Sequence, residues 1–416
     1  MTIIKDFLPS ITGSFAQTAA LLFPRFLGQT GLGLFDINKH MTMRRIIKTI
    51  GILTLILTQK LVMAQQNYEV IARFSPPDPD MSGIAVSSDN RVFLGFPRHA
   101  DNHTAYALAE LVNGKPVPFP SREYVYPSAK PYQEWLVSPH GMYMDQHDML
   151  WVLDDGKGAK INEIPEGAAK VVAIDIRTKK IVHTLVIGRP VLSSDAHYND
   201  LRVDLTHGSQ GTVYIANSGF GERYSLLVID VATGKTREVL LDHPSTSPEP
   251  AFMAFLEGTP HVGDMKKQAF PQGGADGLAL SPDSRKLYWT TISGKTLYSM
   301  ATDTLSNFAL EESTLENAVV KEGQHPACDG LAEDEQGNIY FGAFEQRSVV
   351  KRSPDGQYHL IGHDADRFGW PDGLAYRNGY VYVTLGQWNR LASFNNGTDL
   401  RNPPYLVIRI PADQAR

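Results

Sequence analysis

Apolar and polar residues alternate in short runs along most of the chain after residue 67, which is the pattern of half-buried β-strands. A longer pattern recurs over this alternation: a small or acidic residue before Gly, an apolar pair, a polar turn and an aromatic strand, as in Asp276–Ala279 followed by Leu287–Trp289. Six copies are present, and the equivalent residues at their start are Ser82, His140, Asp200, Asp276, Asp329 and Asp372. Such a repeat indicates an array of similar supersecondary units.

The copies start about 43 to 76 residues apart, which is the length of a four-stranded blade with loops of variable length. Further strand candidates such as Val171–Asp175 and Leu226–Asp230 lie between the copies, and tight-turn pairs such as Asn378-Gly379 separate neighbouring strands. The sequence therefore predicts an all-β protein, a six-bladed β-propeller with four antiparallel strands per blade. A β-sandwich needs no repeat and explains the pattern less well.

The last blade lacks one strand. After the start of the sixth copy, the chain supplies only Tyr380–Leu385 and Tyr405–Ile410 as further strands, and an incomplete ring would expose sheet edges. The one unassigned strand-like segment is Tyr68–Phe74, ahead of the first copy. We predict that this N-terminal strand pairs antiparallel with Tyr405–Ile410 and closes the ring in the last blade.

The residues ahead of this strand have the order of parts of a secretory signal. The basic segment Met43–Lys48 precedes the apolar run Ile50–Leu57, and Ala64 fits a cleavage site. We interpret residues 1–40 as an upstream extension, 41–64 as the signal peptide and 65–416 as the propeller domain. The protein is therefore predicted to be secreted or periplasmic, with no stable membrane insertion after cleavage. An uncleaved signal anchor is the alternative.

Charge narrows the choice of partners. Residues 1–64 hold seven of the 39 Lys and Arg and two of the 45 Asp and Glu, so removing them changes the net charge from −6 to −11. Nucleic acid and anionic membranes are excluded as partners, since both are bound through clustered basic residues. Cys328 is the single cysteine, which excludes an internal disulfide. We expect a monomer that binds a small-molecule ligand.

The innermost strand of each blade lines the channel of a propeller, so the six equivalent residues are expected to form a ring at one mouth. Four of them are aspartates, and converging carboxylates must take up protons, spread apart or bind a cation. Calcium prefers such oxygen ligands. The predicted ligands of Ca²⁺ or another divalent cation are Asn199, Asp200, Asp276, Asp329 and Asp372. The alternative is that each Asp only caps a turn.

His140 is the candidate for proton transfer because a neutral imidazole titrates near working pH. His197, His325 and His363 border other copies and could face the same mouth. Four aromatic residues could stack on a flat ligand, with packing between blades as the alternative: Tyr198, Phe344, Trp370 and Trp388.

Several segments spread over residues 67–416 resemble the yellow/major royal jelly protein family. They are Phe96–Arg98, Leu150–Asp154, Asp276–Pro282 with Lys286–Trp289, and Trp370–Gly373 with Trp388–Leu391. The resemblance implies a six-bladed propeller and activities that differ among members: isomerisation of dopachrome without a cofactor, binding of biogenic amines, and secreted nutritional or signalling roles. A more distant likeness is to six-bladed calcium-dependent lactonases, whose tunnel-lining carboxylates and amides hold the metal. Ser82 and His140 depart from the lactonase pattern, which has a Glu in the first blade.

These observations predict that a small molecule binds at an acidic tunnel mouth. As an enzyme, the protein would be a dopachrome tautomerase-like isomerase or a metal-dependent lactonase, with His140 as the base and Asp276 and Asp372 beside it in the catalytic site. The alternative is a non-catalytic secreted binder of small amines or aromatics. No organic cofactor is expected, because residues 65–416 lack a phosphate-binding Gly-rich loop and a dinucleotide fingerprint.

Overall fold

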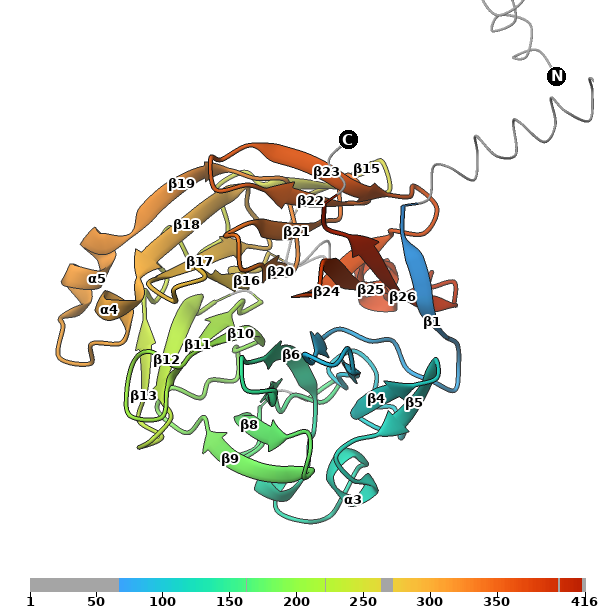
Figure 1. Cartoon of the computed structure of the whole chain (residues 1–416), viewed down its shortest axis with the longest axis horizontal. Helices are drawn as coiled ribbons and strands as arrows, with labels where there is room; N and C mark the ends of the chain where they lie inside the picture. The colour runs from blue at the N-terminus through green and yellow to red at the C-terminus, as the bar shows by residue number, and fades with distance from the viewer. Residues whose placement is uncertain (1–66, 162, 221, 263–271, 396, 414–416) are drawn as a thin grey trace, which may run out of the picture. The chain divides into compact units, whose positions relative to one another are not determined.

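The computed structural model describes residues 67–413 apart from 162, 221, 263–271 and 396. In this part of the chain, six four-stranded sheets stand around a central channel like the blades of a propeller (Figure 1). The predicted fold class is therefore confirmed. The predicted signal peptide and upstream extension lie outside the described residues. No helix of the described part is long and apolar enough to cross a membrane.

Each blade runs from an inner strand at the channel to an outer strand at the rim, and neighbouring strands pair antiparallel. Blade 1 consists of β2 (Ile84–Val86), β3 (Val92–Gly95), β4 (Leu108–Val112) and β5 (Lys115–Pro118). Blade 2 consists of β6 (Pro139–Met144), β7 (Met149–Asp154), β8 (Lys170–Asp175) and β9 (Lys180–Val186). Blade 3 consists of β10 (Tyr198–Asp204), β11 (Thr212–Asn217), β12 (Ser225–Asp230) and β13 (Thr236–Val239).

The second half of the ring repeats this order. Blade 4 consists of β16 (Ala275–Leu280), β17 (Lys286–Thr291), β18 (Thr296–Ala301) and β19 (Val320–Gln324). Blade 5 consists of β20 (Leu331–Glu333), β21 (Ile339–Ala343), β22 (Ser348–Arg352) and β23 (Tyr358–His363). Blade 6 consists of β24 (Trp370–Arg377), β25 (Tyr380–Gly386), β26 (Tyr405–Pro411) and β1 (Glu69–Phe74).

Strand β1 closes the ring in blade 6, as predicted. It pairs antiparallel with β26, from Glu69 opposite Arg409 to Phe74 opposite Tyr405, and Figure 1 shows β1 and β26 side by side in this blade. Glu69 and Arg409 also form an ion pair of 2.6 Å. The register shifts once between Val70 and Ala72. Both termini of the propeller are thus held in one sheet without a disulfide.

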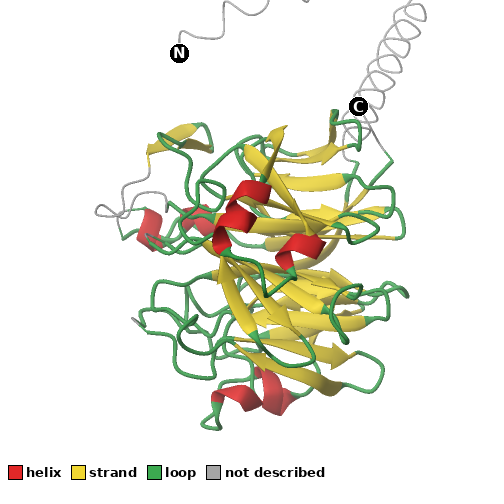
Figure 2. Ribbon diagram, turned by 90° about the vertical axis from the view of Figure 1, so that its left-hand side faces the viewer, coloured by secondary structure: helices red, strands yellow, loops and turns green. Residues whose placement is uncertain are grey.

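Short helices and one extra hairpin lie outside the blades. Among the described residues, the helices are α3 (Arg122–Val125), α4 (Thr302–Leu305) and α5 (Glu312–Ala318), with 3₁₀ turns η1 (Tyr132–Glu134), η3 (Trp388–Arg390) and η4 (Ala392–Phe394). Figure 2 shows that the strands fill the body of the molecule and α4 and α5 lie on its outside. The hairpin of β14 (Met253–Leu256) and β15 (Thr259–Val262) follows blade 3, and an ion pair of 2.6 Å joins Glu257 at its tip to Arg390. This excursion therefore spans from blade 3 to blade 6.

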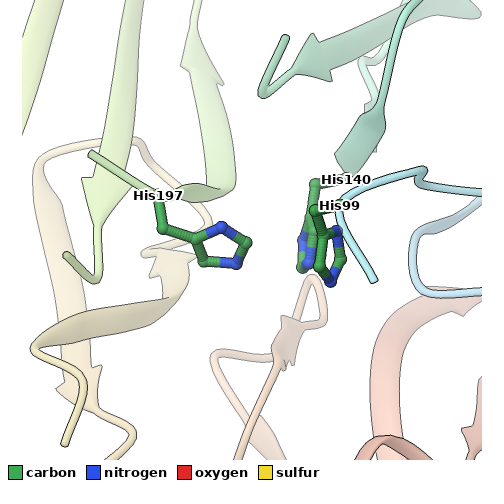
Figure 3. Close-up of side chains that lie close together, drawn as sticks. All are labelled: His99, His140 and His197. Carbon is green, nitrogen blue, oxygen red and sulfur yellow. The ribbon is translucent and has the colours of Figure 1, made fainter. Parts of the chain in front are cut away.

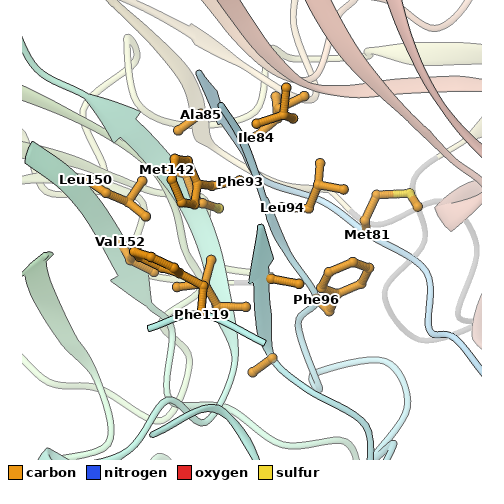
Figure 4. Close-up of a cluster of buried hydrophobic side chains, with 14 of the residues drawn as sticks. Met81, Ile84, Ala85, Phe93, Leu94, Phe96, Phe119, Met142, Leu150 and Val152 are labelled. Atoms are coloured by element: carbon orange, nitrogen blue, oxygen red, sulfur yellow. The ribbon is translucent and has the colours of Figure 1, made fainter. Parts of the chain in front are cut away.

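Apolar side chains fill the space between neighbouring blades. Between blades 1 and 2, Phe93 and Phe119 meet edge to face with ring centroids 4.8 Å apart and pack in one cluster with Leu150 and Val152 (Figure 4). Leu150 and Val152 lie two residues apart in β7 and therefore on the same face of its sheet. The packing holds the inner strands at fixed positions around the channel, which positions the residues described next.

Candidate functional site

The inner strands begin with one shared irregularity. In blade 4, Ala275 pairs with Thr291 and Leu278 pairs with Trp289, and the register shifts between these two pairs at Asp276 and Gly277. Blades 2, 3 and 6 have the same shift, and blades 1 and 5 make the equivalent backbone hydrogen bonds. We call the first residue of each step the ring position. The six ring residues are Ser82, His140, Asn199, Asp276, Asp329 and Asp372.

Blade 3 differs from the sequence-based alignment by one residue. Tyr198 pairs with Asn217 and Leu201 pairs with Ile215, which places Asn199 at the ring position and Asp200 where the other blades have Gly. The Asp200 carboxylate accepts a hydrogen bond of 3.1 Å from the Leu278 N–H and forms an ion pair of 3.1 Å with Arg202. The sequence-based alignment matched Asp200 to the aspartates of the other blades. It missed the one-residue shift because blade 3 has an Asp at the position where the other blades have Gly.

The glycine after the ring position has a steric reason. A Cβ on Gly83 would lie 2.1 Å from the backbone oxygen of His140, and a Cβ on Gly330 would lie 2.4 Å from that of Asp372. Real Cβ atoms do not approach backbone oxygens so closely, so a side chain there would push neighbouring inner strands apart. The glycine that follows the ring residue in five of the six blades thus lets the inner strands pack tightly enough to bring the ring side chains together.

Asp276, Asp329 and Asp372, which we call the carboxylate cluster, are buried at the ring positions of blades 4, 5 and 6. Burial raises the pKa of all three carboxyls, that of Asp329 to about 6, and the charge of Asp329 raises the pKa of the other two further. Within the described residues, no Lys or Arg forms an ion pair with the cluster. Three acids therefore share a site in which no basic side chain balances their charge.

Neutral donors hold part of the cluster. Trp370 Nε1 donates to Asp329 at 2.5 Å, and Trp388 Nε1 donates to Asp372 at 2.6 Å. Two of the four predicted ligand-binding aromatics therefore contact the cluster through their indole N–H groups. Trp388 is also partly exposed, so its ring borders the open side of the mouth.

The other two predicted aromatics lie in the packing around the mouth. Phe344 is buried and stacks on Trp370 with ring centroids 4.5 Å apart and an interplanar angle of 5°. Tyr198 is fully buried among apolar residues of blades 2 and 3, and its hydroxyl lies 3.4 Å from the backbone oxygen of Val191. The structure does not bring Phe344 or Tyr198 to the channel surface.

Asp276 differs from its two neighbours in one atom. Its Oδ2 accepts hydrogen bonds from the Asn199 amide at 2.5 Å and from the Ser218 hydroxyl at 2.9 Å. Its Oδ1 is buried and accepts no hydrogen bond from an N–H or hydroxyl donor among the described residues. The Asp276 and Asp329 carboxyls are hydrogen-bonded to each other, which opposes ionisation of Asp276 and favours that of Asp329, so the pair shares a proton.

A cavity of about 20 Å³ lies at the ring, where it has room for about one water-sized particle. Its polar wall is formed by Ser82, His140, Asn199, Asp200, Asp329 and Asp372. Its apolar part is formed by Ile84, Met142, Leu331 and Leu374, which follow the ring along the inner strands. The ring itself therefore has space for an ion or a water molecule, and an organic ligand must bind outside it.

A larger cavity of about 260 Å³ lies at the opposite end of the inner strands. Arg202 stands in its wall, paired with Asp200 at 3.1 Å and with Glu333 at 2.9 Å. This Arg is almost fully buried and satisfies both acids. We place the candidate site at the other mouth, because the buried carboxyls there have no basic partner among the described residues, unlike Asp200 and Glu333.

Three histidines gather beside the ring: His99 from the loop between β3 and β4, His140 from β6, and His197 from the residue before β10. Their rings lie 5.0 to 5.2 Å apart between centroids. One nitrogen of each lies within 4.8 Å of a nitrogen of the other two. Figure 3 shows His99 and His140 side by side and the ring of His197 pointing toward them. We call these residues the histidine cluster.

Burial lowers the pKa of all three histidines, that of His140 and of His197 to about 3. Neighbouring positive charge adds to this effect: protonated His197 lowers the pKa of His99 and His140, and Lys157 lowers that of His197. The three imidazoles are thus neutral at pH 7. A base with so low a pKa accepts protons weakly, so His140 is a poor general base in this state.

Sequence reasoning found only part of this cluster. His140 was expected from the repeat, and His197 was one of three further candidates. Of the other two, His325 is buried against Phe341, and His363 is exposed at the end of β23. His99 was missed because it follows the Phe96–Arg98 segment in an irregular loop, where no periodicity marks it.

Fold and site together define a six-bladed propeller with a buried acidic ring and a histidine cluster at one mouth. The chain belongs to the major royal jelly protein family, whose model matches residues 137–405. The resemblance seen in the sequence is therefore confirmed. A comparison with curated protein sequences finds no significant match.

Solved structures with similar folds are distant in sequence. A gluconolactonase from Xanthomonas campestris is 13% identical, with a TM-score of 0.46 over 84% of this chain and 92% of that one. Regucalcin from Agrobacterium tumefaciens, described as a calcium-binding protein, is 12% identical, with a TM-score of 0.44 over 82% and 93%. Virginiamycin B lyase from Staphylococcus aureus is 12% identical, with a TM-score of 0.45 over 83% and 98%.

Proposed function

We propose that this protein is exported and binds a small molecule at the mouth of the channel, above a divalent cation of the calcium class held by the carboxylate cluster. The observation that carries the proposal is the carboxylate cluster itself: three buried carboxyls that no basic side chain of the described residues neutralises, of which Asp276 and Asp329 share a proton. A cation at this place would replace that proton and remove the repulsion within the cluster.

The donor set fits a hard cation. Calcium takes six to eight oxygen ligands in a flexible shell, and carboxylate, amide and hydroxyl oxygens all serve. The three carboxyls converge, and the Ser82 hydroxyl lies 3.3 Å from Asp372. A half-turn of the Asn199 amide, which now donates to Asp276, would present its oxygen to the same space. We leave Asp200 out of the proposed ligand set because Arg202 already pairs with it.

A location outside the cytoplasm is consistent with a calcium site of low affinity. Extracellular modules bind calcium with dissociation constants of about 10⁻⁴ to 10⁻³ M, which suits the concentration outside cells. The net charge of −11 for residues 65–416 favours cations generally. The apolar segment Ile50–Leu57 with its basic start supports a signal for export.

Among small molecules, the site favours a neutral ligand with a carbonyl group, such as a lactone. A bound calcium ion would polarise such a carbonyl. The protein's own contribution is to place the ligand: the partly exposed Trp388 ring borders the mouth, and the neutral His140 can accept or donate one hydrogen bond. Isomerisation of an oxidised catechol without a cation is less well supported, since it needs a base stronger than an imidazole with a pKa of about 3.

A non-catalytic binder of amines is the second candidate. The observation that favours it is the indole of Trp388, which stands next to carboxylates at the open side of the mouth. A protonated amine is attracted by both an aromatic face and an acid. In this case the amine, rather than a metal ion, supplies the positive charge.

Calorimetry of the purified, untagged protein separates these candidates. We expect CaCl₂ to bind to the chelator-treated protein and to raise its melting temperature by mass action, and Asp276→Asn to weaken this binding at least tenfold. Asp366→Asn, which removes an exposed acid of blade 5, is the matched control. Turnover of aldonolactones that requires calcium would support the enzyme.

Three results count against the proposal. Identical calcium titrations of the Asp276→Asn and native proteins would show that the carboxylate cluster does not bind the cation. Tight binding of an amine with no turnover of lactones or of dopachrome would show that the protein is a non-catalytic binder. Turnover of dopachrome in the presence of a chelator would show that the activity is that of a cofactor-free tautomerase and not of a lactonase.

A further inference from the structure

The histidine cluster has the geometry of a second, different metal site. We infer that His99, His140 and His197 bind one divalent transition metal ion of the zinc class. The three side chains come from three separate segments in blades 1, 2 and 3, and one nitrogen of each lies within 4.8 Å of the others. This inference goes beyond the proposed function and does not depend on a cation in the carboxylate cluster.

Ligand type decides the class of metal. Imidazole nitrogen is the preferred ligand of zinc, copper, nickel and iron, whereas calcium and magnesium prefer oxygen. Three histidines with a fourth position open to water or substrate form a known zinc geometry. With Zn–N bonds of about 2.1 Å, the ligand nitrogens of a tetrahedral site are about 3.4 Å apart. Small rotations of the rings would bring the present spacing of up to 4.8 Å to that value.

Each ring has one nitrogen available for the metal. His140 Nδ1 lies 3.2 Å from the backbone oxygen of Asn199, so a hydrogen bond there leaves Nε2 for the metal. His197 Nδ1 lies 3.3 Å from the Asp155 carboxylate. His99 Nδ1 is buried and has no hydrogen-bond partner among the described residues. An orphaned nitrogen beside two oriented imidazoles points to a missing ligand.

Asp155 has the place of a supporting carboxylate. It is fully buried and follows β7 directly. Its Oδ1 accepts a hydrogen bond of 3.2 Å from the Tyr198 N–H, and its Oδ2, which faces His197 Nδ1, has no hydrogen-bond partner among the described residues. Metal-bound histidines commonly donate their second N–H to such a carboxylate, which fixes the ring and makes it a better ligand.

Packing alone accounts less well for the cluster. Buried histidines usually satisfy both nitrogens through hydrogen bonds, whereas here three rings face one another. The cluster also borders the site described above, since Ser82 Oγ lies 3.4 Å from His140 Nδ1 and 3.3 Å from Asp372.

The test uses untagged, chelator-treated full-length protein and Co²⁺, whose visible absorption in a tetrahedral nitrogen site differs from that of the hydrated ion. We expect about one equivalent of Co²⁺ to give the tetrahedral spectrum and Zn²⁺ to displace it. His99→Ala is the deciding variant, because it removes a ligand but no hydrogen bond of the described chain. It should weaken Co²⁺ binding at least tenfold.

Matched variants separate ligand loss from damage to the fold. Asp155→Asn should weaken Co²⁺ binding by about 10- to 100-fold, as loss of a supporting carboxylate does. His147→Ala, which removes an exposed histidine of blade 2, and Asp276→Asn should leave Co²⁺ binding unchanged. If Asp276→Asn loses calcium but keeps Co²⁺, the two sites are independent.

Two results would overturn the inference. One is a native protein that gives no tetrahedral Co²⁺ spectrum at concentrations where it is folded. The other is Co²⁺ affinity in His99→Ala equal to that of the native protein, with unchanged melting temperature, because the bound metal would then lie elsewhere. Either result leaves the calcium experiment to be judged separately.

Discussion

The carboxylate cluster and the histidine cluster lie at the same mouth, but the chain builds them differently. The three carboxyls occupy one repeated position in successive blades 4, 5 and 6. Of the three histidines, only His140 has that position; His197 stands two residues before the ring residue of blade 3, and His99 lies in a loop of blade 1. A repeat therefore assembles the first cluster, and only the folded chain assembles the second.

Burial acts on both clusters toward the neutral form, but in opposite directions on the pKa scale. It raises the pKa of the carboxyls and lowers that of the imidazoles. At pH 7 without a bound metal, the histidine cluster is thus neutral and the carboxylate cluster keeps the charge of Asp329. Each cluster offers ligand atoms of one type. The same mouth can therefore bind a hard cation through the carboxylate oxygens and a borderline cation through the imidazole nitrogens.

The largest effect is expected from removing strand β1, because the loss of stability affects both clusters. Deleting residues up to Ser75 removes β1, its ladder with β26, and the burial of Phe74 and Ala72. We expect a loss of about 3–5 kcal/mol in the free energy of unfolding, measured by urea denaturation. Both metal affinities should fall together with the folded fraction. An unchanged midpoint would show that β1 is dispensable for closure.

This strand also marks how far the sequence could predict the molecule. Alternation and counting of strands were enough for the blades and for β1, because pairing and burial repeat with a period of two along each strand. The same repeat gave five of the six ring residues. It missed Asn199 as a ring residue, since an Asp in place of Gly disguised the register of blade 3.

The histidine cluster could not be predicted in this way. His99 and Asp155 lie in loops that have no period, and their positions depend on how blades 1 and 2 pack. The indole N–H bonds from Trp370 to Asp329 and from Trp388 to Asp372 were also hidden, because sequence gives an aromatic residue but not the direction of its ring. Side chains that converge from loops require the structure.

The second largest effect is expected in the pH dependence of stability, which should have opposite sign for the two clusters. Asp329 has a folded pKa of about 6, raised by burial above the unfolded value of about 3.9. Its contribution to stability is present below about pH 4 and is lost as the pH rises through about 6. His140 and His197, with pKa values of about 3, act oppositely: their contribution is present above about pH 6.5 and is lost as the pH falls.

In chelator, Asp329→Asn should remove the first dependence and keep the second. Between pH 4 and pH 7 the native protein should lose about 2–3 kcal/mol more stability than this variant, measured by urea denaturation at each pH. The Asn oxygen can still accept the Trp370 N–H bond. Asp366→Asn, the exposed control, should keep the native dependence. Parallel curves for the native and Asp329→Asn proteins would contradict the assignment.

A single methyl group should affect one cluster and spare the other. Gly330→Ala places a Cβ 2.4 Å from the backbone oxygen of Asp372, so the strands of blades 5 and 6 must move apart at a cost of about 1–3 kcal/mol. Calcium binding should weaken at least tenfold, while Co²⁺ binding in blades 1 to 3 stays native. Gly188→Ala, whose nearest neighbour is 3.4 Å away at the Glu166 carboxylate, is the control. Equal loss of both metals would mean that the clusters are mechanically coupled.

The smallest expected effect concerns Trp388, which contacts both clusters. Its Nε1 donates to Asp372 at 2.6 Å, and its ring lies 5.3 Å from that of His99 between centroids. Trp388→Phe removes the hydrogen bond and keeps an aromatic ring beside His99. Since this bond lowers the pKa of Asp372 against the larger effect of burial, its loss should raise that pKa further and cost about 1 kcal/mol in chelator at pH 7. Thermal melts would measure the cost, and Co²⁺ titration should be unchanged. If Co²⁺ binding weakens instead, the indole itself positions His99, and the two clusters are joined through this side chain.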